Sequence, residues 1–201
     1  MKKTLISHPA SSFVWLVCLF PLWIPAATAQ TFRITNPDEQ TVRFFANHTL
    51  GEVDGTLHPV TGTLTFNPGG PTSGLSGHFT ADMTSFDTGL GLRDKDMRNK
   101  YLETEQYPEA TFTLHDALPT LLDDGTGDTL HLVVAGSMTL HGTTRDHPVT
   151  ATLAPTPDGY RIHAVFSLLL SDYGIPPPKR FMLTVQDEIR VELDLTLVQQ
   201  P

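Results

Sequence analysis

Cysteine is almost absent from this chain. Its 201 residues include one cysteine, Cys18, so no disulfide can form within the chain. Cys18 lies in an N-terminal apolar run that we expect to be removed, which leaves no thiolate nucleophile and no cysteine metal ligand. The remaining chain must be held together by burial of apolar side chains, which fits a bacterial envelope better than a disulfide-dense extracellular module.

Long hydrophobic runs are also scarce. The run Phe13–Ile24 has 12 residues, fewer than the roughly 20 that a membrane-spanning helix needs. Lys2 and Lys3 precede it, and Ala27-Thr28-Ala29 follows it as a small-x-small cleavage site. We predict a signal peptide over residues 1–29, cleaved near Ala29, and a single periplasmic or secreted domain over residues 30–201.

Basic residues are too few to favour polyanionic partners. The chain has 13 Lys and Arg against 22 Asp and Glu, and removal of Lys2 and Lys3 leaves 11 basic side chains and a formal net charge of −11. This balance argues against nucleic acid as a partner and against electrostatic docking to anionic lipid.

Catalytic motifs are missing as well. The sequence contains no G-x-S-x-G, phosphate-binding loop, dinucleotide fingerprint or H-E-x-x-H. We therefore assign no catalytic residues, no metal ligands and no cofactor, and we predict that the protein is not an enzyme. Residues 124–128 resemble a calcium loop only in part, because the glycine and the closing glutamate are absent, and we interpret them as a hairpin loop.

The histidines follow no metal-binding pattern. His78, His131 and His141 fall on predicted outward faces, where we expect solvated side chains, and His141 and His147 flank a turn. His48 lies at a predicted strand end, which we expect it to pin through a hydrogen bond.

What the sequence does contain is alternation of apolar and polar residues with a period of two, which is typical of β-strands with one buried face. Breaks rich in Gly, Pro, Asn and Asp separate the segments. Many short strands with tight turns predict an all-β antiparallel sandwich or barrel. The predicted strands are Val42–Ala46, Gly51–Leu57, Val60–Phe66, Leu75–Met83, Ala110–His115, Leu130–Leu140, Val149–Ala154, Tyr160–Leu170, Phe181–Val185 and Ile189–Leu197.

Two stretches depart from this pattern. Residues Arg93–Leu102 are highly charged, and Asp94 and Arg98 form an acid-before-base pair at helical spacing. We predict a short helix there, ended by Tyr107-Pro108. Its charges could line the mouth of a site, but a solvated helix face is the simpler interpretation. Pro176-Pro177-Pro178 predicts an extended, stiff connection between strands.

The predicted inner face mixes large and small apolar residues. Closing the sheet into a barrel would remove its edges and turn this face inward. Two alternatives remain open at this point, a tunnel and a dry, filled core, because alternation does not measure volume. A ligand of this lining would be apolar. The candidate ligand-binding residues are Phe44, Ala46, Leu64, Phe66, Phe79, Ala81, Met83, Phe112, Leu132, Val134, Met138, Ala151, Ala164, Phe166 and Leu168.

The chain also resembles a known family, the YceI-like, lipocalin-like polyisoprenoid-binding periplasmic proteins. The resemblance covers about Phe32 to Val198 and depends on the joint order of several motifs. These are Phe44–His48, Val60-x-Gly62-x-Leu64-x-Phe66, Met83-Thr84-Ser85-Phe86-Asp87-Thr88-Gly89, Arg93-Asp94-x-x-Met97-Arg98, Tyr101-Leu102-Glu103, Tyr107-Pro108-x-x-Thr111-Phe112, Gly136-x-Met138-Thr139-Leu140-His141-Gly142-x-Thr144 and Asp172-Tyr173-Gly174-Ile175.

This resemblance implies an extended eight-stranded antiparallel barrel with a short helix near its mouth. It implies an interior that takes a polyisoprenoid or quinone-like lipid, and it favours the tunnel over the filled core as the interpretation of the inner face. A homodimer is a further implication. One position departs from the family, because Leu170 stands where relatives often carry Arg, so a head group contacted by that Arg would be bound differently here or not at all.

We therefore expect an exported lipid-binding protein that sequesters or transports an apolar long-chain lipid. The alternative is a filled-core structural or interaction protein that acts in the envelope stress response or beside a membrane redox protein.

Overall fold

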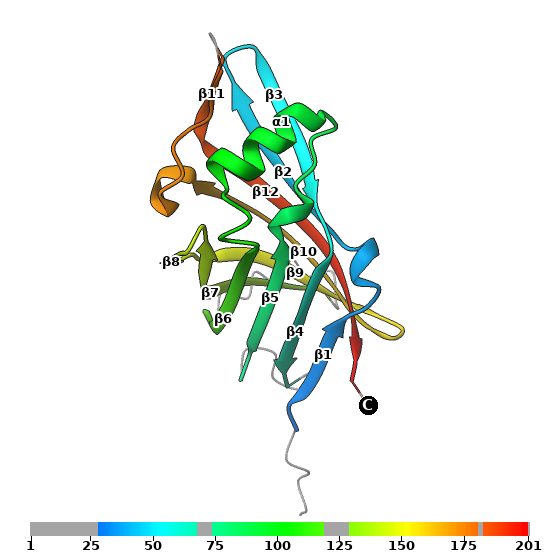
Figure 1. Ribbon diagram of the computed structural model, residues 1–201. Coiled ribbons are helices and arrows are strands. Elements are labelled where there is room, and N and C mark those ends of the chain that lie inside the picture. The colour runs from blue at the N-terminus through cyan, green and yellow to red at the C-terminus, as the bar shows by residue number, and fades with distance from the viewer. Residues whose placement is uncertain (1–27, 68–73, 119–128, 181–182, 201) are drawn as a thin grey trace, which may run out of the picture.

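The computed structural model describes residues 28–67, 74–118, 129–180 and 183–200, and over them the chain forms a closed eight-stranded antiparallel barrel with one short helix at one end (Figure 1). The strands are β1 (Gln30–Ile34), β2 (Thr41–His48), β3 (Gly51–Leu57), β4 (Val60–Phe66), β5 (Ser76–Asp82), β6 (Glu109–Leu118), β7 (Leu130–Leu140), β8 (Thr143–Asp146), β9 (Val149–Thr156), β10 (Gly159–Leu169), β11 (Lys179–Arg180) and β12 (Leu183–Gln199).

The wall closes through the longest strand, β12. The ring runs β1-β4-β5-β6-β7-β9-β10-β12, and β12 returns to β1 through pairs such as Phe32–Gln199 and Ile34–Leu197. Further along, β12 pairs with β2, and β2 pairs with β3. The β2–β3 hairpin thereby extends the wall toward the helix, beyond β1 and β4 (Figure 1). Closure leaves β1, β4 and β12 with no free edge between them, which limits aggregation.

A buried side chain replaces the backbone partner where β1 gives way to β2. The two strands are separated by a 3₁₀ turn, Pro37–Glu39. The backbone N–H of Thr35 donates to the Thr196 carbonyl at 3.2 Å, and the Thr196 N–H donates to Gln40 Oε1 at 2.9 Å. Gln40 is buried, so the polar groups of β12 stay satisfied where the ladder is broken.

The helical segment is α1 (Gly91–Asp96), which continues directly into a π-helical turn, Met97–Tyr101. It lies at the end of the barrel opposite β1, where β2 and β3 also extend (Figure 1). The predicted helix near Arg93–Leu102 is therefore confirmed, with a start two residues earlier. Pro176-Pro177-Pro178 lies between a 3₁₀ turn, Leu170–Tyr173, and β11 and forms no strand, as predicted.

Several strand predictions need correction. β1 and β8 were not predicted. Of the predicted strand Phe181–Val185, residues 181–182 lie outside the described residues, and Leu183 onward belongs to β12, where a register shift between Val185 and Ile189 interrupts the alternation. Met83 lies in a 3₁₀ turn, because the Asp82 carboxylate accepts the Thr84 N–H at 2.8 Å and ends the strand.

The remaining strand predictions are confirmed to within a few residues at their ends. Residues 1–27, most of the predicted signal peptide, and the predicted hairpin loop 124–128 lie outside the described residues.

The apolar core consists of two clusters rather than one. The first, at the β1 end, includes Phe32, Phe66 and Leu197. The second, at the α1 end, includes Phe86 and Tyr173. Val42, Ala81 and Phe166 pack against both clusters and are only partly buried, which indicates unfilled space inside the barrel.

Candidate functional site

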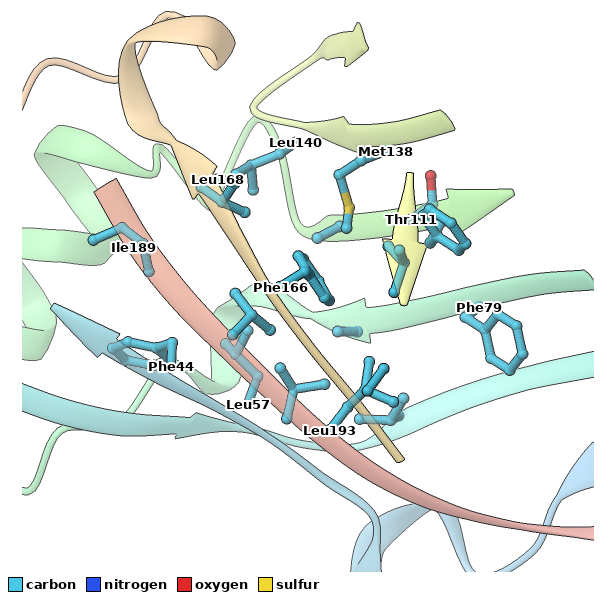
Figure 2. A pocket seen from close by; sticks show the side chains of 18 of the residues that line it. Phe44, Leu57, Phe79, Thr111, Met138, Leu140, Phe166, Leu168, Ile189 and Leu193 are labelled. Carbon is cyan, nitrogen blue, oxygen red and sulfur yellow. The ribbon is translucent and has the colours of Figure 1, made fainter. Parts of the chain in front are cut away.

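The barrel encloses an apolar cavity of about 270 Å³. All the strands of the ring except β1 contribute to its lining, together with β2, β3 and the helical segment. Figure 2 shows Phe44, Phe79, Phe166, Ile189 and Leu193 directed from different strands toward this common space. The volume is just below the roughly 300–1,000 Å³ of typical small-molecule sites, so it suits a slender ligand.

The cavity is long as well as narrow. On β12 its lining extends from Val185 to Leu195. At about 3.3 Å per residue that distance is roughly 33 Å along the strand, and a strand tilt of about 40° reduces it to roughly 25 Å along the barrel axis. A tunnel of this shape fits an extended chain better than a compact ligand.

Inward rings along the tunnel are not fully packed. Phe79, Phe112 and Phe166 are only partly buried although they contact the core. A side chain on the inner face of a filled barrel would be fully buried, because neighbouring side chains would interdigitate with it. These rings border open space, so the filled-core alternative does not describe this barrel.

Glycines in the strands explain why the rings leave the lumen open. A Cβ on Gly55 would lie 2.2 Å from Phe44 Cζ, and a Cβ on Gly136 would lie 2.4 Å from Phe112 Cζ. Each ring therefore lies against the backbone of the adjacent strand, in space that only glycine leaves free. Because the rings lie along the wall, they fill less of the centre.

At the β1 end the cavity is closed by aromatic rings. Phe32, Phe66 and Tyr160 contact one another with ring centroids 5.0 to 5.1 Å apart. None of the three lines the cavity. We call these three residues the aromatic floor.

Among the described residues that line the cavity, Arg93 at the α1 end is the only charged one. Its Nε donates to Thr88 Oγ1 at 2.6 Å, and its Nη2 donates to the Thr88 carbonyl at 2.9 Å. The Thr88 hydroxyl donates in turn to buried Asp94, whose Oδ1 also accepts the Thr88 N–H at 3.0 Å. The guanidinium is thus engaged by Thr88, whose hydroxyl links it to the Asp94 carboxylate.

These contacts correct the interpretation of the helix as a solvated charged face. Asp94 is buried and Arg93 is half-buried. Arg98 donates to the Phe86 carbonyl at 2.6 Å, and Phe86 stacks on Phe44 with centroids 4.6 Å apart. Asp96 keeps the expected kind of ion pair, with Lys100 at 2.8 Å. The charged side chains of Arg93, Asp94 and Arg98 therefore hold the residues at the mouth of the cavity in place and are not all solvated.

A second polar contact ties the segment after the helix to the β7–β8 hairpin. His141 Nε2 lies 2.8 Å from Glu103 Oε2, and His141 Nδ1 lies 3.3 Å from the Tyr173 carbonyl. The Tyr107 ring meets the imidazole edge-on at 4.6 Å. The prediction that His141 is solvated is therefore wrong, because it joins three segments that are distant in the sequence.

The exposure and contacts of three other histidines can be compared with their predicted roles. His78 is exposed, as predicted, and His131 is partly buried. His48 Nδ1 accepts the Leu50 N–H at 3.2 Å and holds the β2–β3 turn, which confirms its predicted role. Among the described residues, no group of three or more His, Cys, Asp or Glu side chains is placed to hold a metal ion. No described helix is long and apolar enough to cross a membrane.

A second, polar depression is lined by residues at the ends of β8 and β10 and by the turn after β10, among them Arg145, His147, Asp172 and Tyr173. Burial lowers the pKa of His147 below its ordinary value, and Asp172 partly opposes this. Burial also raises the pKa of Tyr173, with a further contribution from Asp172. These shifts come from packing of the wall and do not concern the tunnel.

The structure brings the predicted ligand-binding residues together. All of them except Phe66 line the cavity. Phe66 lies one layer below, in the aromatic floor, because the lumen ends before its position is reached. Contact of these residues with a ligand stays a prediction.

Sequence reasoning missed several lining residues, including Arg93, Val185 and Leu170. Arg93 lies in a helix and Val185 precedes the register shift of β12, so neither follows the alternation. Leu170 continues the apolar alternation of the predicted strand Tyr160–Leu170 and could have been found from it. The departure at Leu170 places an apolar side chain in the cavity wall.

The closed antiparallel barrel and its apolar tunnel define the class of protein: a β-barrel with a hydrophobic interior, of the lipocalin-like type. Residues 34–197 match the YceI-like domain. The chain belongs to the YceI-like family, as its motifs predicted.

Relatives by sequence cover most of the chain. The UPF0312 protein plu2095 of Photorhabdus laumondii is 30% identical over 156 residues, which are 76% of this chain and 73% of that protein. Protein YceI of Escherichia coli O157:H7 is 30% identical over 153 residues, which are 75% of this chain and 71% of that protein.

Solved structures share the fold. BcnA of Burkholderia cenocepacia has a TM-score of 0.65 at 19% identity and covers 78% of this chain and 94% of its own. A polyisoprenoid-binding domain from Saccharophagus degradans, implicated in plant cell wall breakdown, has a TM-score of 0.64 at 15% identity and covers 86% and 100%. At such identities the likeness concerns the fold alone.

Proposed function

We propose that this protein is an exported, non-enzymatic lipid carrier whose barrel holds the tail of a polyisoprenoid or quinone-like amphiphile. The observation that carries the proposal is the tunnel itself, which has a single charged lining residue, Arg93, at one end. Each methylene group moved from water into such a lining contributes about 0.8 kcal/mol. A tail of about ten carbons therefore contributes about 8 kcal/mol before the costs of association and ordering.

Leaving the tunnel empty would be costly. At about 24 cal/mol per Å³ of cavity, an empty space of 270 Å³ forgoes on the order of 6 kcal/mol of packing. That amount is comparable to the whole free energy of unfolding of a typical domain, about 5–15 kcal/mol. Apolar cavities also hold water poorly, because the water finds no hydrogen-bond partners. A hydrocarbon chain in the tunnel would restore the lost packing and would need no hydrogen-bond partners.

The head group would lie at the α1 end. Leu170 is apolar, and Arg93 donates to Thr88, whose hydroxyl donates in turn to the Asp94 carboxylate. A neutral or quinone-like head group therefore fits the mouth better than a diphosphate, which would need unpaired cations. Periplasmic or secreted location, a homodimer and a membrane redox partner stay predictions from the sequence.

Organic extraction of protein purified from the native host, followed by mass spectrometry, tests the proposal. We expect one stoichiometric apolar lipid in the wild type. Ala151 lines the cavity from β9, and its neighbour Thr150 is exposed. Ala151→Phe should fill the tunnel and abolish the lipid, whereas Thr150→Phe adds the same ring outside and should leave it. Repeatedly empty wild-type extracts would refute the carrier.

A further inference from the structure

The tunnel ends at the same level on three strands. Leu64 on β4, Ile162 on β10 and Leu195 on β12 line the cavity. The next inward positions, two residues further along these strands, are Phe66, Tyr160 and Leu197, and none of them lines it. Inward positions recur every second residue, so the layer directly after the last lining residues of these strands closes the lumen there.

The closing layer spans the barrel. In the ring of strands, β4 and β10 are separated by β1 and β12, yet the rings of Phe66 and Tyr160 meet at a centroid distance of 5.1 Å and an interplanar angle of 72°. Phe32 on β1 contacts both, stacked on Phe66 and edge-on to Tyr160. Three mutually contacting rings close the lumen in a geometry that aromatic groups favour.

Two of the three floor rings are packed in the core. Phe32 and Phe66 are 2% and 1% exposed, and Tyr160 is partly buried at the edge of the floor. The tunnel rings Phe79 and Phe112 are only partly buried. Phe32 and Phe66 therefore lie in packed core, whereas Phe79 and Phe112 face the cavity, which places the floor at the β1 end of the tunnel.

We propose that the aromatic floor of Phe32, Phe66 and Tyr160 sets the longest lipid tail that the tunnel accepts. This inference rests on the proposed lipid-carrier function. A tail enters from the α1 end and advances until its terminal methyl group meets the floor. Each isoprene unit up to that length is desolvated, and any unit beyond it must stay in water or buckle. The floor is therefore a specificity-determining element for tail length.

Competition among neutral isoprenols of two, three, four and six isoprene units, read out by native mass spectrometry, tests this assignment. In the wild type, occupancy should rise at least tenfold with each added unit and stop rising at one length. Phe66→Leu lowers the floor and should move that length up by one unit, with at least a fivefold gain for the longer competitor. Tyr160→Leu removes a ring at the edge of the floor and provides a second variant if Phe66→Leu does not fold.

Two further variants make the test directional. Leu195→Phe places a ring in the last lining layer and should move the preferred length down. Phe45→Leu is the matched control, because Phe45 lies on β2 against Arg190, with the guanidinium 3.6 Å from its ring centroid, and outside the cavity lining. It should keep the wild-type length preference.

The outcomes separate the two proposals. Retention of no isoprenol by the wild type refutes the carrier function, and the floor inference falls with it. Retention by the wild type with one unchanged length preference in Phe66→Leu, Tyr160→Leu and Leu195→Phe overturns the floor inference alone.

Discussion

Tyr173 shows at the residue scale how a buried polar atom limits stability. The side chain is 1% exposed, and among the described residues its hydroxyl has no hydrogen-bond partner. An unsatisfied buried hydroxyl costs about 1–3 kcal/mol. Tyr173→Phe should therefore raise the free energy of unfolding by about 1 kcal/mol, measured by urea denaturation.

Tyr101 provides the matched control for that substitution. Its hydroxyl lies 3.3 Å from both the N–H and the carbonyl of Lys179. Tyr101→Phe removes the same atom but breaks these contacts, so it should lower stability. A loss of stability in Tyr173→Phe would show that its hydroxyl is satisfied.

His147 makes stability depend on pH. Its ring packs edge-on against Phe166 at 5.2 Å, and burial holds its pKa below the ordinary value. The unfolded chain binds a proton at about pH 6.5, so between pH 6.5 and the lowered pKa it binds more protons than the folded chain. The free energy of unfolding should fall as the pH is lowered through this window.

His147→Phe removes this contribution. Urea denaturation between pH 5 and 8 should give the variant a shallower decline toward acid than the wild type. Above pH 7.5 the two curves should run parallel, because the imidazole is then neutral in both states. Equal slopes throughout the acid window would contradict the assignment.

At the scale of elements, strand glycines keep the tunnel open. A Cβ on Gly136 of β7 would lie 2.4 Å from Phe112 Cζ and 2.7 Å from the Thr113 carbonyl oxygen of β6. Gly136→Ala should push the Phe112 ring into the lumen and strain the β6–β7 pairing. We expect a loss of about 1–3 kcal/mol in stability and reduced lipid occupancy.

Two variants check this account. The double variant Gly136→Ala/Phe112→Leu removes the ring that the added Cβ would meet. It should recover part of the lipid occupancy that Gly136→Ala loses. Gly91→Ala in α1 meets nothing within 4 Å and should leave occupancy unchanged. Normal occupancy in Gly136→Ala alone would show that the rings do not depend on the glycines.

At the scale of the whole molecule, β1 closes both the wall and the floor. It pairs with β4 and with β12, and it carries Phe32. A chain that begins at Asn36 would lose these pairings, expose two strand edges and open the floor. We expect it to aggregate or to elute as oligomers in size-exclusion chromatography, whereas a chain that begins at Thr28 should elute as the wild type does.

The β1 prediction also has a stability readout. Since closure couples strands that are distant in the sequence, thermal unfolding of the shortened chain should begin at a lower temperature than that of the chain from Thr28. A soluble shortened chain with the same thermal midpoint would show that closure through β1 is dispensable.

Much of the fold followed from local pattern. The alternation over Val60–Phe66 or Leu130–Leu140 predicts a strand because it depends only on residues two apart. β1 escaped prediction because five residues, with Phe32 and Ile34 as its buried positions, carry little periodic signal. Arg93 and Val185 escaped because one lies in a helix and the other precedes the register shift of β12, where the alternation of the strand does not apply.

The sequence by itself determined an all-β chain whose strands have one apolar face, and hence the polarity of anything held between them, because side-chain direction along a strand is a local property. Only the tertiary structure decided that the enclosed space is hollow, that it ends at Phe66 and Tyr160, and that Arg93 is engaged by Thr88 at its mouth. Volume and closure depend on which distant strands meet, and no local pattern records that.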